Sequence, residues 1–170
     1  MGESTNVALA YCAGLIDGEG CIYITRHRRE KYLHGHGFGL MISLNIIESK
    51  PVDYLIGILG GNHYSYINKK YGYYMNSWNM YGRAAANALK KIRKYLIVKK
   101  DQADVAIEFQ NHLDRTKSLS FTKNPELYEY RTNLYNKIKA LKKIRAGVEH
   151  NSSESESLSD VPNLEEIPVT

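Results

Sequence analysis

The sequence predicts an α+β protein with an αββαββα core. Two pairs of segments rich in β-branched and aromatic residues alternate between apolar and polar positions, as strands with one buried face do. An apolar helical segment precedes each pair, and further helical segments follow the second pair. Two hairpins separated by a helix indicate a four-stranded antiparallel sheet with helices on one face and extra C-terminal helices.

The first helix and the first hairpin occupy the N-terminal quarter of the chain. Residues 7–16 form a compact apolar segment, with Asn6 as an acceptable N-cap. The glycines around Glu19 end this helix. Residues 21–28 and 38–47 then alternate as strands do, so we expect them to pair.

The second helix and the second hairpin repeat this order. Ser49 stands where a helix would be capped, and Pro51 suits its first turn. This helix stops at residues 60–61, which are both glycine, and strands are expected at 63–69 and 73–80.

The remainder is helical and then changes composition. Helices are expected over 83–95 and 99–113, and a last basic helix starts at Pro125. The segment 147–170 is rich in Ser and Glu and has no periodicity, so it is interpreted as a disordered acidic tail. The sequence therefore predicts one folded domain, residues 1–146, followed by this tail.

The charge is unevenly distributed. Six of the 18 acidic residues follow Arg145 and no Lys or Arg does, so residues 1–146 hold 23 basic and 12 acidic residues, or +11. Such a charge favours a polyanionic partner, most simply nucleic acid, although a solvated basic surface remains an alternative.

Several classes of protein are excluded or disfavoured. No apolar run approaches the ~20 residues of a membrane span, and the N-terminus lacks the pattern of a secretory signal. Cys12 and Cys21 cannot form a disulfide scaffold or a four-cysteine zinc site. We therefore expect an intracellular protein in a reducing compartment.

A nine-residue motif carries the functional prediction. Residues 12–20 read CAGLIDGEG and follow an apolar helix directly before an alternating strand. This segment resembles the signature of the LAGLIDADG homing endonucleases, with Glu19 in place of the second Asp of the motif. The matching positions are Ala13, Gly14, Leu15, Ile16, Asp17 and Gly20.

Helical spacing gives the motif a physical meaning of its own. Ala10, Gly14 and Gly18 lie at i, i+4 and i+8, a stripe without bulky side chains that allows close approach of another helix. The stripe could equally pack inside the subunit. Glu19 follows at the C-terminal end of the helix, where the macrodipole disfavours a carboxylate unless a cation lies nearby. Asp17 is interpreted as a structural residue that caps backbone groups.

The resemblance implies a function, a cofactor and an assembly. It implies a site-specific double-strand DNA endonuclease that uses Mg²⁺ (or Mn²⁺) and leaves short 3′ overhangs. Because only one motif is present, it implies a homodimer through the motif helix on a long, near-palindromic DNA site. It assigns metal binding to Glu19 and Gly18 and catalysis to Glu19, Glu48 and Lys99, with Lys100 as the alternative lysine.

Strand alternation predicts which side chains face away from the helices, on a saddle-shaped face that would contact DNA. This outward set is mostly polar and could contact base edges and phosphates in a major groove. Its members are Tyr23, Thr25, His27 and Arg29 in the first strand, Met41, Ser43 and Asn45 in the second, Tyr66, Asn68 and Lys70 in the third, and Met75, Ser77 and Asn79 in the fourth. Ile22, Ile24, Ile42, Leu44, Ile46, Ile67, Trp78 and Met80 are expected to face the core.

Two other functions compete with the endonuclease. The first is a non-catalytic DNA binder or intron RNA maturase of the same fold, which would tolerate the loss of Glu19. The second is a basic structural module, which predicts only a weak dependence of DNA binding on salt.

Overall fold

The computed structural model describes residues 2–30, 35–70, 72–119 and 124–145, and the predicted acidic tail lies outside these residues. The predicted α+β fold is confirmed, with the order αββαββα followed by two more helices. The elements are α1 (Gly2–Gly18), β1 (Gly20–Arg28), β2 (His36–Ile46), α2 (Lys50–Leu59), β3 (Asn62–Ile67), β4 (Tyr74–Tyr81), α3 (Gly82–Ile92), a 3₁₀ turn (Arg93–Tyr95), α4 (Lys100–Arg115) and α5 (Pro125–Arg145).

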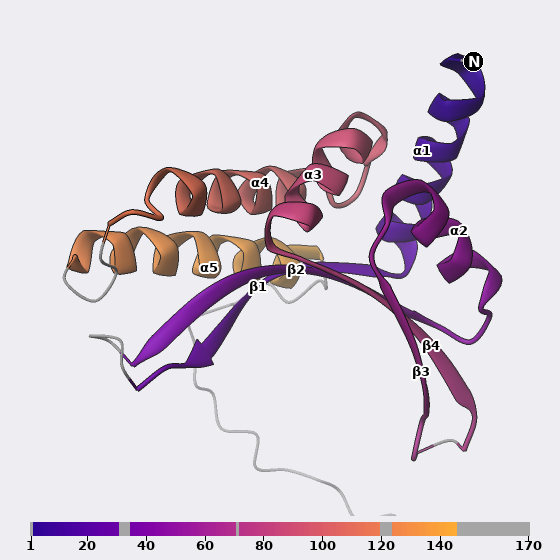
Figure 1. Cartoon of the computed structure of the whole chain (residues 1–170), viewed down its shortest axis with the longest axis horizontal. Helices are drawn as coiled ribbons and strands as arrows, with labels where there is room; N and C mark the ends of the chain where they lie inside the picture. The colour runs from indigo at the N-terminus through magenta and orange to yellow at the C-terminus, as the bar shows by residue number, and fades with distance from the viewer. Residues whose placement is uncertain (1, 31–34, 71, 120–123, 146–170) are drawn as a thin grey trace, which may run out of the picture.

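The four strands form one antiparallel sheet in the order β1-β2-β4-β3. The helices lie on one side of this sheet, and the two hairpins curve away from them (Figure 1). The opposite side of the sheet is therefore an arched, helix-free surface. We call it the saddle face.

The core lies between the sheet and the helices. Its sheet side holds the predicted inward residues Ile22, Ile24, Ile42, Leu44, Trp78 and Met80, all at most 5% exposed. Its helix side holds Ala85, Leu89 and Ile92 of α3 and Ala103, Ala106 and Phe109 of α4, all fully buried. Leu134 and Ile138 of α5 join the same cluster, so the C-terminal helices belong to the domain.

One predicted helix cap is wrong, and the other lies at the expected position without a capping side-chain hydrogen bond. Helix α1 begins at Gly2 rather than after Asn6, whose side-chain oxygen accepts a hydrogen bond from the Tyr95 hydroxyl at 2.7 Å. Ser49 does stand at the N-cap position of α2, but its side chain makes no capping hydrogen bond. Its backbone is already helical, at φ −78° and ψ −34°, whereas a capping residue adopts extended angles.

The prediction that Ile67 is buried is also wrong. Every residue of β3 is exposed, and Ile67 is 52% exposed. Ile67 is the last residue of β3 and pairs with Tyr74, the first residue of β4, at the turn end of this hairpin. The hairpin extends away from the helices (Figure 1).

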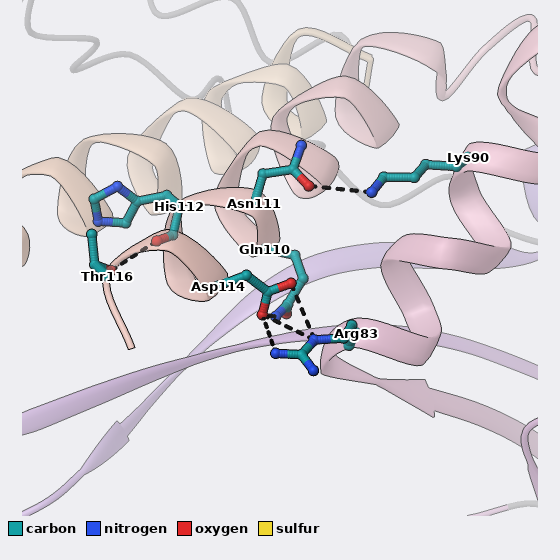
Figure 2. Close-up of polar contacts among 7 residues, drawn as sticks. All are labelled: Arg83, Lys90, Gln110, Asn111, His112, Asp114 and Thr116. Atoms are coloured by element: carbon teal, nitrogen blue, oxygen red, sulfur yellow. Dashed lines mark hydrogen bonds and ion pairs between the residues drawn. The ribbon is translucent and has the colours of Figure 1, made fainter. Parts of the chain in front are cut away.

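Helix α4 is fastened to α3 by a group of polar contacts (Figure 2). The Arg83 guanidinium donates to both carboxylate oxygens of Asp114, at 2.8–3.1 Å, and holds the pKa of Asp114 below its usual value. Gln110 donates to the same carboxylate at 3.1 Å, and Lys90 donates to Asn111 at 3.2 Å. These contacts hold α4, which begins directly after Lys99, beside α3.

None of the described helices is long and apolar enough to span a membrane.

Candidate active site and nucleic-acid face

Glu19 lies at a tight turn between α1 and β1. Its backbone N–H closes the helix by donating to the Leu15 carbonyl at 2.9 Å, and Gly20 begins the strand. A Cβ atom on Gly20 would lie 2.8 Å from the Ile16 backbone, so only glycine fits this close approach. The turn leaves Gly18 and Glu19 exposed at the tip of the helix.

Asp17 has the structural role expected for it, and its partners are the segment before α4. One carboxylate oxygen accepts hydrogen bonds from the backbone N–H groups of Ile97, at 2.7 Å, and Val98, at 3.2 Å. The other accepts from the N–H of Lys99 at 2.9 Å. Because charge-assisted hydrogen bonds are the stronger kind, this carboxylate ties the start of α4 to the end of α1.

Lys99 is buried at the end of the motif helix. Only 3% of it is exposed, and its ammonium donates to the carbonyl of Ile16 at 2.7 Å and to that of Asp17. A cation at the C-terminal end of a helix is favourable, and here it satisfies carbonyls that the helix leaves without partners. Lys100 is exposed, so the structure separates the two lysines that the sequence left as alternatives. Lys99 is the one bound to the end of the motif helix, at Ile16 and Asp17.

Glu48 lies on a different element. It is exposed on the connection between β2 and α2, one residue after Ile47. Helix α2 packs against α1, with the rings of Tyr54 and Tyr11 in edge contact at 5.1 Å. The structure thus joins Lys99 to Ile16 and Asp17, in the helix end that precedes Glu19, and it places Glu48 before the start of the neighbouring helix.

The predicted outward residues do lie on the saddle face, but several of them are covered. Strand register aligns Cys21, Ser43, Asn79 and Asn62 in one row across the sheet. Ser43 is 9% exposed, Asn79 2% and Ser77 1%, and Asn79 donates to Ser77 at 3.1 Å. The expectation that these three residues are open to DNA is therefore wrong.

Two tyrosines on this face were missed. Register places Tyr64 beside Ser77 and Tyr81 beside Met41, and these tyrosines are 53% and 54% exposed. Tyr66, which was predicted, lies 6.0 Å from the ring of Tyr64 and is 39% exposed. The alternation continued two residues before Tyr66 reaches Tyr64, and continued two residues after Asn79 it reaches Tyr81, so the same pattern identifies both tyrosines.

Other outward residues lie near the hairpin ends. His27 and Arg29 are exposed, and both side chains lie close to Gly37. A Cβ atom at Gly37 would lie 2.6 Å from the His27 ring and 3.2 Å from the Arg29 side chain. The Thr25 hydroxyl donates to the Gly39 carbonyl at 3.0 Å. In the second hairpin, the Asn68 side chain accepts from the backbone N–H of Lys70 in the turn. Met75 and Tyr23 are half-buried, Asn45 is exposed, and the Tyr23 hydroxyl donates to the Met41 sulfur.

The small-residue stripe of α1 is open. Ala10, Gly14 and Gly18 are all exposed, and no described part of the chain outside α1 itself lies within 4 Å of a Cβ atom built on either glycine. The alternative that this stripe packs inside the subunit is therefore wrong. Exposed apolar side chains flank it: Val7 and Tyr11 on α1 itself, Tyr54, whose ring contacts that of Tyr11, and Ile97, whose backbone N–H donates to Asp17. Val7, Tyr11 and Tyr54 also line a hollow of about 430 Å³ with Lys50 and Pro51.

Comparison with known proteins gives a consistent fold. No protein-family model and no curated protein matches the chain. Among solved structures, the homing endonuclease I-CvuI, in complex with its target in the presence of Ca, is 23% identical, with a TM-score of 0.65 over 81% of this chain and 83% of that chain. The archaeal intron-encoded homing endonuclease I-Vdi141I, complexed with DNA, is 16% identical, with a TM-score of 0.67 over 91% and 90%.

A third neighbour carries the family name. The I-SmaMI LAGLIDADG homing endonuclease, bound to cleaved DNA, is 16% identical, with a TM-score of 0.59 over 91% of this chain and 53% of that chain. These identities are low, so the likeness concerns the fold. The CAGLIDGEG segment of this chain forms the end of α1 and the turn after it. The chain has the fold of the LAGLIDADG homing endonucleases.

Proposed function

We propose that the protein is a site-specific double-strand DNA endonuclease of the homing type, which hydrolyses phosphodiester bonds with a divalent metal ion. The observation that carries this proposal is the position of Glu19. It is an exposed carboxylate at the C-terminal end of α1, a helix whose small-residue face is open. The hydrogen bonds of Asp17 and Lys99 fix this helix end to the segment before α4. The neighbours that share the fold and are bound to DNA support the same function.

The donor groups at the tip fit Mg²⁺ or Mn²⁺. The Glu19 carboxylate and the Gly18 carbonyl are hard oxygen donors, and both residues are exposed. No group of three or more His, Cys, Asp or Glu side chains able to hold a metal occurs among the described residues, so one chain offers only part of a ligand set. Glu19 of a second copy and DNA phosphate oxygens would complete it. A metal ion bound there would polarise the phosphate and lower the pKa of water.

Two further side chains have proposed roles in the reaction. The Lys99 ammonium lies at the helix tip, where it would stabilise negative charge that develops on the scissile phosphate. The exposed Glu48 carboxylate would accept a hydrogen bond from the attacking water.

The assembly we propose is a symmetric homodimer through α1. Two copies of the stripe Ala10–Gly14–Gly18 would pack backbone to backbone, and the flanking apolar side chains named above would bury one another. This arrangement brings the two Glu19 carboxylates together and joins two saddle faces. A two-fold axis then requires a near-palindromic DNA site. Cleavage across a minor groove with 3′ overhangs is part of the same proposal.

A second candidate is binding without cleavage, either of DNA or of intron RNA as a maturase. The specific observation in its favour is the group of exposed tyrosines on the saddle face, Tyr64, Tyr66 and Tyr81. Aromatic rings can stack on unpaired bases, which a duplex does not present.

The discriminating experiment starts by selecting bound duplexes from a random library. These sites are then incubated with the protein in EDTA, Mg²⁺ or Mn²⁺. The endonuclease predicts cleavage that requires the metal and is lost in Glu19→Gln, while binding in EDTA is retained. Selected sites that are bound but never cut in either metal would contradict the endonuclease and favour the non-catalytic binder.

A further inference from the structure

Asn76 of β4 forms a hydrogen bond to the connection that carries Glu48. The Asn76 side chain is 9% exposed and lies on the helix-covered side of the sheet, the same side as Trp78. Its Nδ2 donates to the carbonyl of Ile47 at 2.6 Å. Ile47 is the residue after the end of β2 and directly precedes Glu48.

The orientation of this amide is set by neighbours on β3. A carbonyl only accepts, so the nitrogen of the Asn76 amide must face Ile47 and its oxygen must face the other way. That oxygen accepts from the Ser65 hydroxyl at 2.8 Å and lies 3.0 Å from His63 Nε2. His63 Nδ1 in turn lies 3.8 Å from the Asp53 carboxylate in the first turn of α2.

Strand β4 holds the two ends of α2 with two side chains on one face. Asn76 holds the Ile47 carbonyl before α2, and Trp78 Nε1 donates to the Gly60 carbonyl at its C-terminal end, at 2.8 Å. These two contacts lie at opposite ends of α2. Only the Asn76 contact is next to Glu48; the Trp78 contact lies at the opposite end of the helix.

We propose that Asn76 is a positioning residue, which fixes the Ile47 carbonyl and thereby the place of the Glu48 carboxylate in the active site. Ser65 and His63 assist by holding the Asn76 amide in the donating orientation. This inference rests on the proposed endonuclease function, and it adds residues of the second hairpin to the catalytic machinery. Because Asn76 lies on the covered side of the sheet, it acts without touching DNA.

The test is a double-mutant cycle on single-turnover cleavage of a selected DNA site. Asn76→Asp keeps the size and the acceptor of the side chain but replaces the donor by an acceptor that repels the Ile47 carbonyl. We expect its cleavage rate to fall about tenfold to a hundredfold. Its dissociation constant for DNA in EDTA should stay within about threefold of the wild-type value, since the saddle face is unchanged.

The decisive comparison is made in the Glu48→Gln background. If Asn76 acts through Glu48, then adding Asn76→Asp to Glu48→Gln causes no further loss of rate. A residue that merely stabilises the fold would lower the rate of both backgrounds equally. The matched control is Asn111→Asp, the same chemical change on α4, where the side chain accepts a hydrogen bond from Lys90 of α3. It should leave cleavage unchanged.

Ser65→Ala is a second test that remains available if Asn76→Asp does not fold. Ser65 is exposed, and its substitution removes only one hydrogen-bond donor to Asn76, so this variant should fold. We expect a smaller loss of rate, which also disappears in the Glu48→Gln background. Wild-type rates in Asn76→Asp and Ser65→Ala, or an equal loss in both backgrounds, would overturn the inference while the endonuclease stands. Absence of cleavage by the wild-type protein itself would instead overturn the proposed function and this inference with it.

Discussion

Asp17 and Lys99 are joined in both directions. The Lys99 backbone N–H donates to the Asp17 carboxylate at 2.9 Å, and the Lys99 ammonium donates to the Asp17 backbone carbonyl. The carboxylate thus caps the segment before α4, while the ammonium caps the end of α1. Two residues later the chain reaches Glu19, so this reciprocal contact sets the position of the proposed catalytic carboxylate.

Asp17→Asn should destabilise the fold. An amide offers one acceptor oxygen, and its NH₂ group would face backbone donors that the carboxylate now accepts from. We expect a loss of about 1–3 kcal/mol in the free energy of unfolding, measured by urea denaturation. Glu129→Gln, at an exposed position of α5, is the control and should change stability little. Equal stabilities of the two variants would contradict the capping role.

Lys99→Met and Lys100→Met should differ sharply, although the two lysines are adjacent. Lys99→Met removes the donor to the carbonyls of Ile16 and Asp17 and the positive charge at the helix tip. We expect a fall of about a hundredfold in single-turnover cleavage, whereas Lys100→Met should cut nearly as fast as the wild type. The opposite ranking would show that the exposed lysine is the functional one.

Gly14→Leu should separate dimerisation from folding. No described part of the chain outside α1 itself lies within 4 Å of a Cβ atom on Gly14, so the variant should fold as a monomer with normal circular dichroism. A bulky side chain would prevent two α1 helices from approaching closely. Analytical ultracentrifugation should show loss of the dimer, while Ala84→Leu, an exposed position on α3, should remain dimeric. A Gly14→Leu dimer would refute the proposed interface.

The saddle face should depend on its tyrosines more than on its buried polar residues. Tyr64→Ala and Tyr81→Ala remove exposed side chains whose hydroxyl groups can donate to DNA phosphates, and we expect each to weaken DNA binding about tenfold. Ser77→Ala should leave the affinity within about twofold, because Ser77 is 1% exposed. Arg29→Ala should reduce the salt dependence of binding, which the tyrosine variants should preserve. A Ser77→Ala defect as large as that of Tyr64→Ala would contradict the assignment.

His112 should make the stability of the domain depend on pH. Burial lowers the pKa of His112 below its usual value of 6.5, and the positive charges of Arg131 and Arg115 lower it further, while Glu108 opposes them. The unfolded chain therefore binds the proton more readily than the folded one does. Stability should be full above pH 6.5 and should fall as the pH decreases from there towards the lowered pKa.

The measurement for this prediction is the melting temperature between pH 7.5 and 5. In His112→Gln the part of the slope that belongs to this histidine should vanish. The ring of His112 packs against that of Tyr130 in a tilted arrangement, with centroids 4.3 Å apart, so the variant will be less stable at every pH. A slope that persists unchanged in His112→Gln would exclude His112 as its source.

Much of the fold could be predicted because its signals are local. Alternation placed all four strands, and the Gly-rich CAGLIDGEG segment placed the turn after α1. Helical spacing also identified the open stripe, but whether it was covered depended on where α2 and α3 pack, which no local pattern contains. The prediction for the start of α1 failed for a similar reason. The side-chain oxygen of Asn6 accepts a hydrogen bond from Tyr95, a residue 89 positions away, and does not cap the helix.

The site was predictable in its residue types and less so in its contacts. The sequence could not choose between Lys99 and Lys100, because the choice depends on the segment Ile97–Lys99 folding onto Asp17. Alternation assigned Ser77 and Asn79 to the correct face. Whether their side chains are exposed depends on how the strands pair, which alternation alone does not determine. The Asn76 contact joins residues 29 positions apart and requires the pairing of β2 with β4.

The central claim is that Glu19 residues of two copies share a metal site on DNA. The most direct measurement is anomalous diffraction from Mn²⁺ in crystals of the protein bound to a selected DNA site. We predict an anomalous peak at about 2.2 Å from Glu19 carboxylate oxygens of both copies, beside a phosphate. Mn²⁺ bound elsewhere, with the two Glu19 carboxylates far apart on the DNA, would contradict the account.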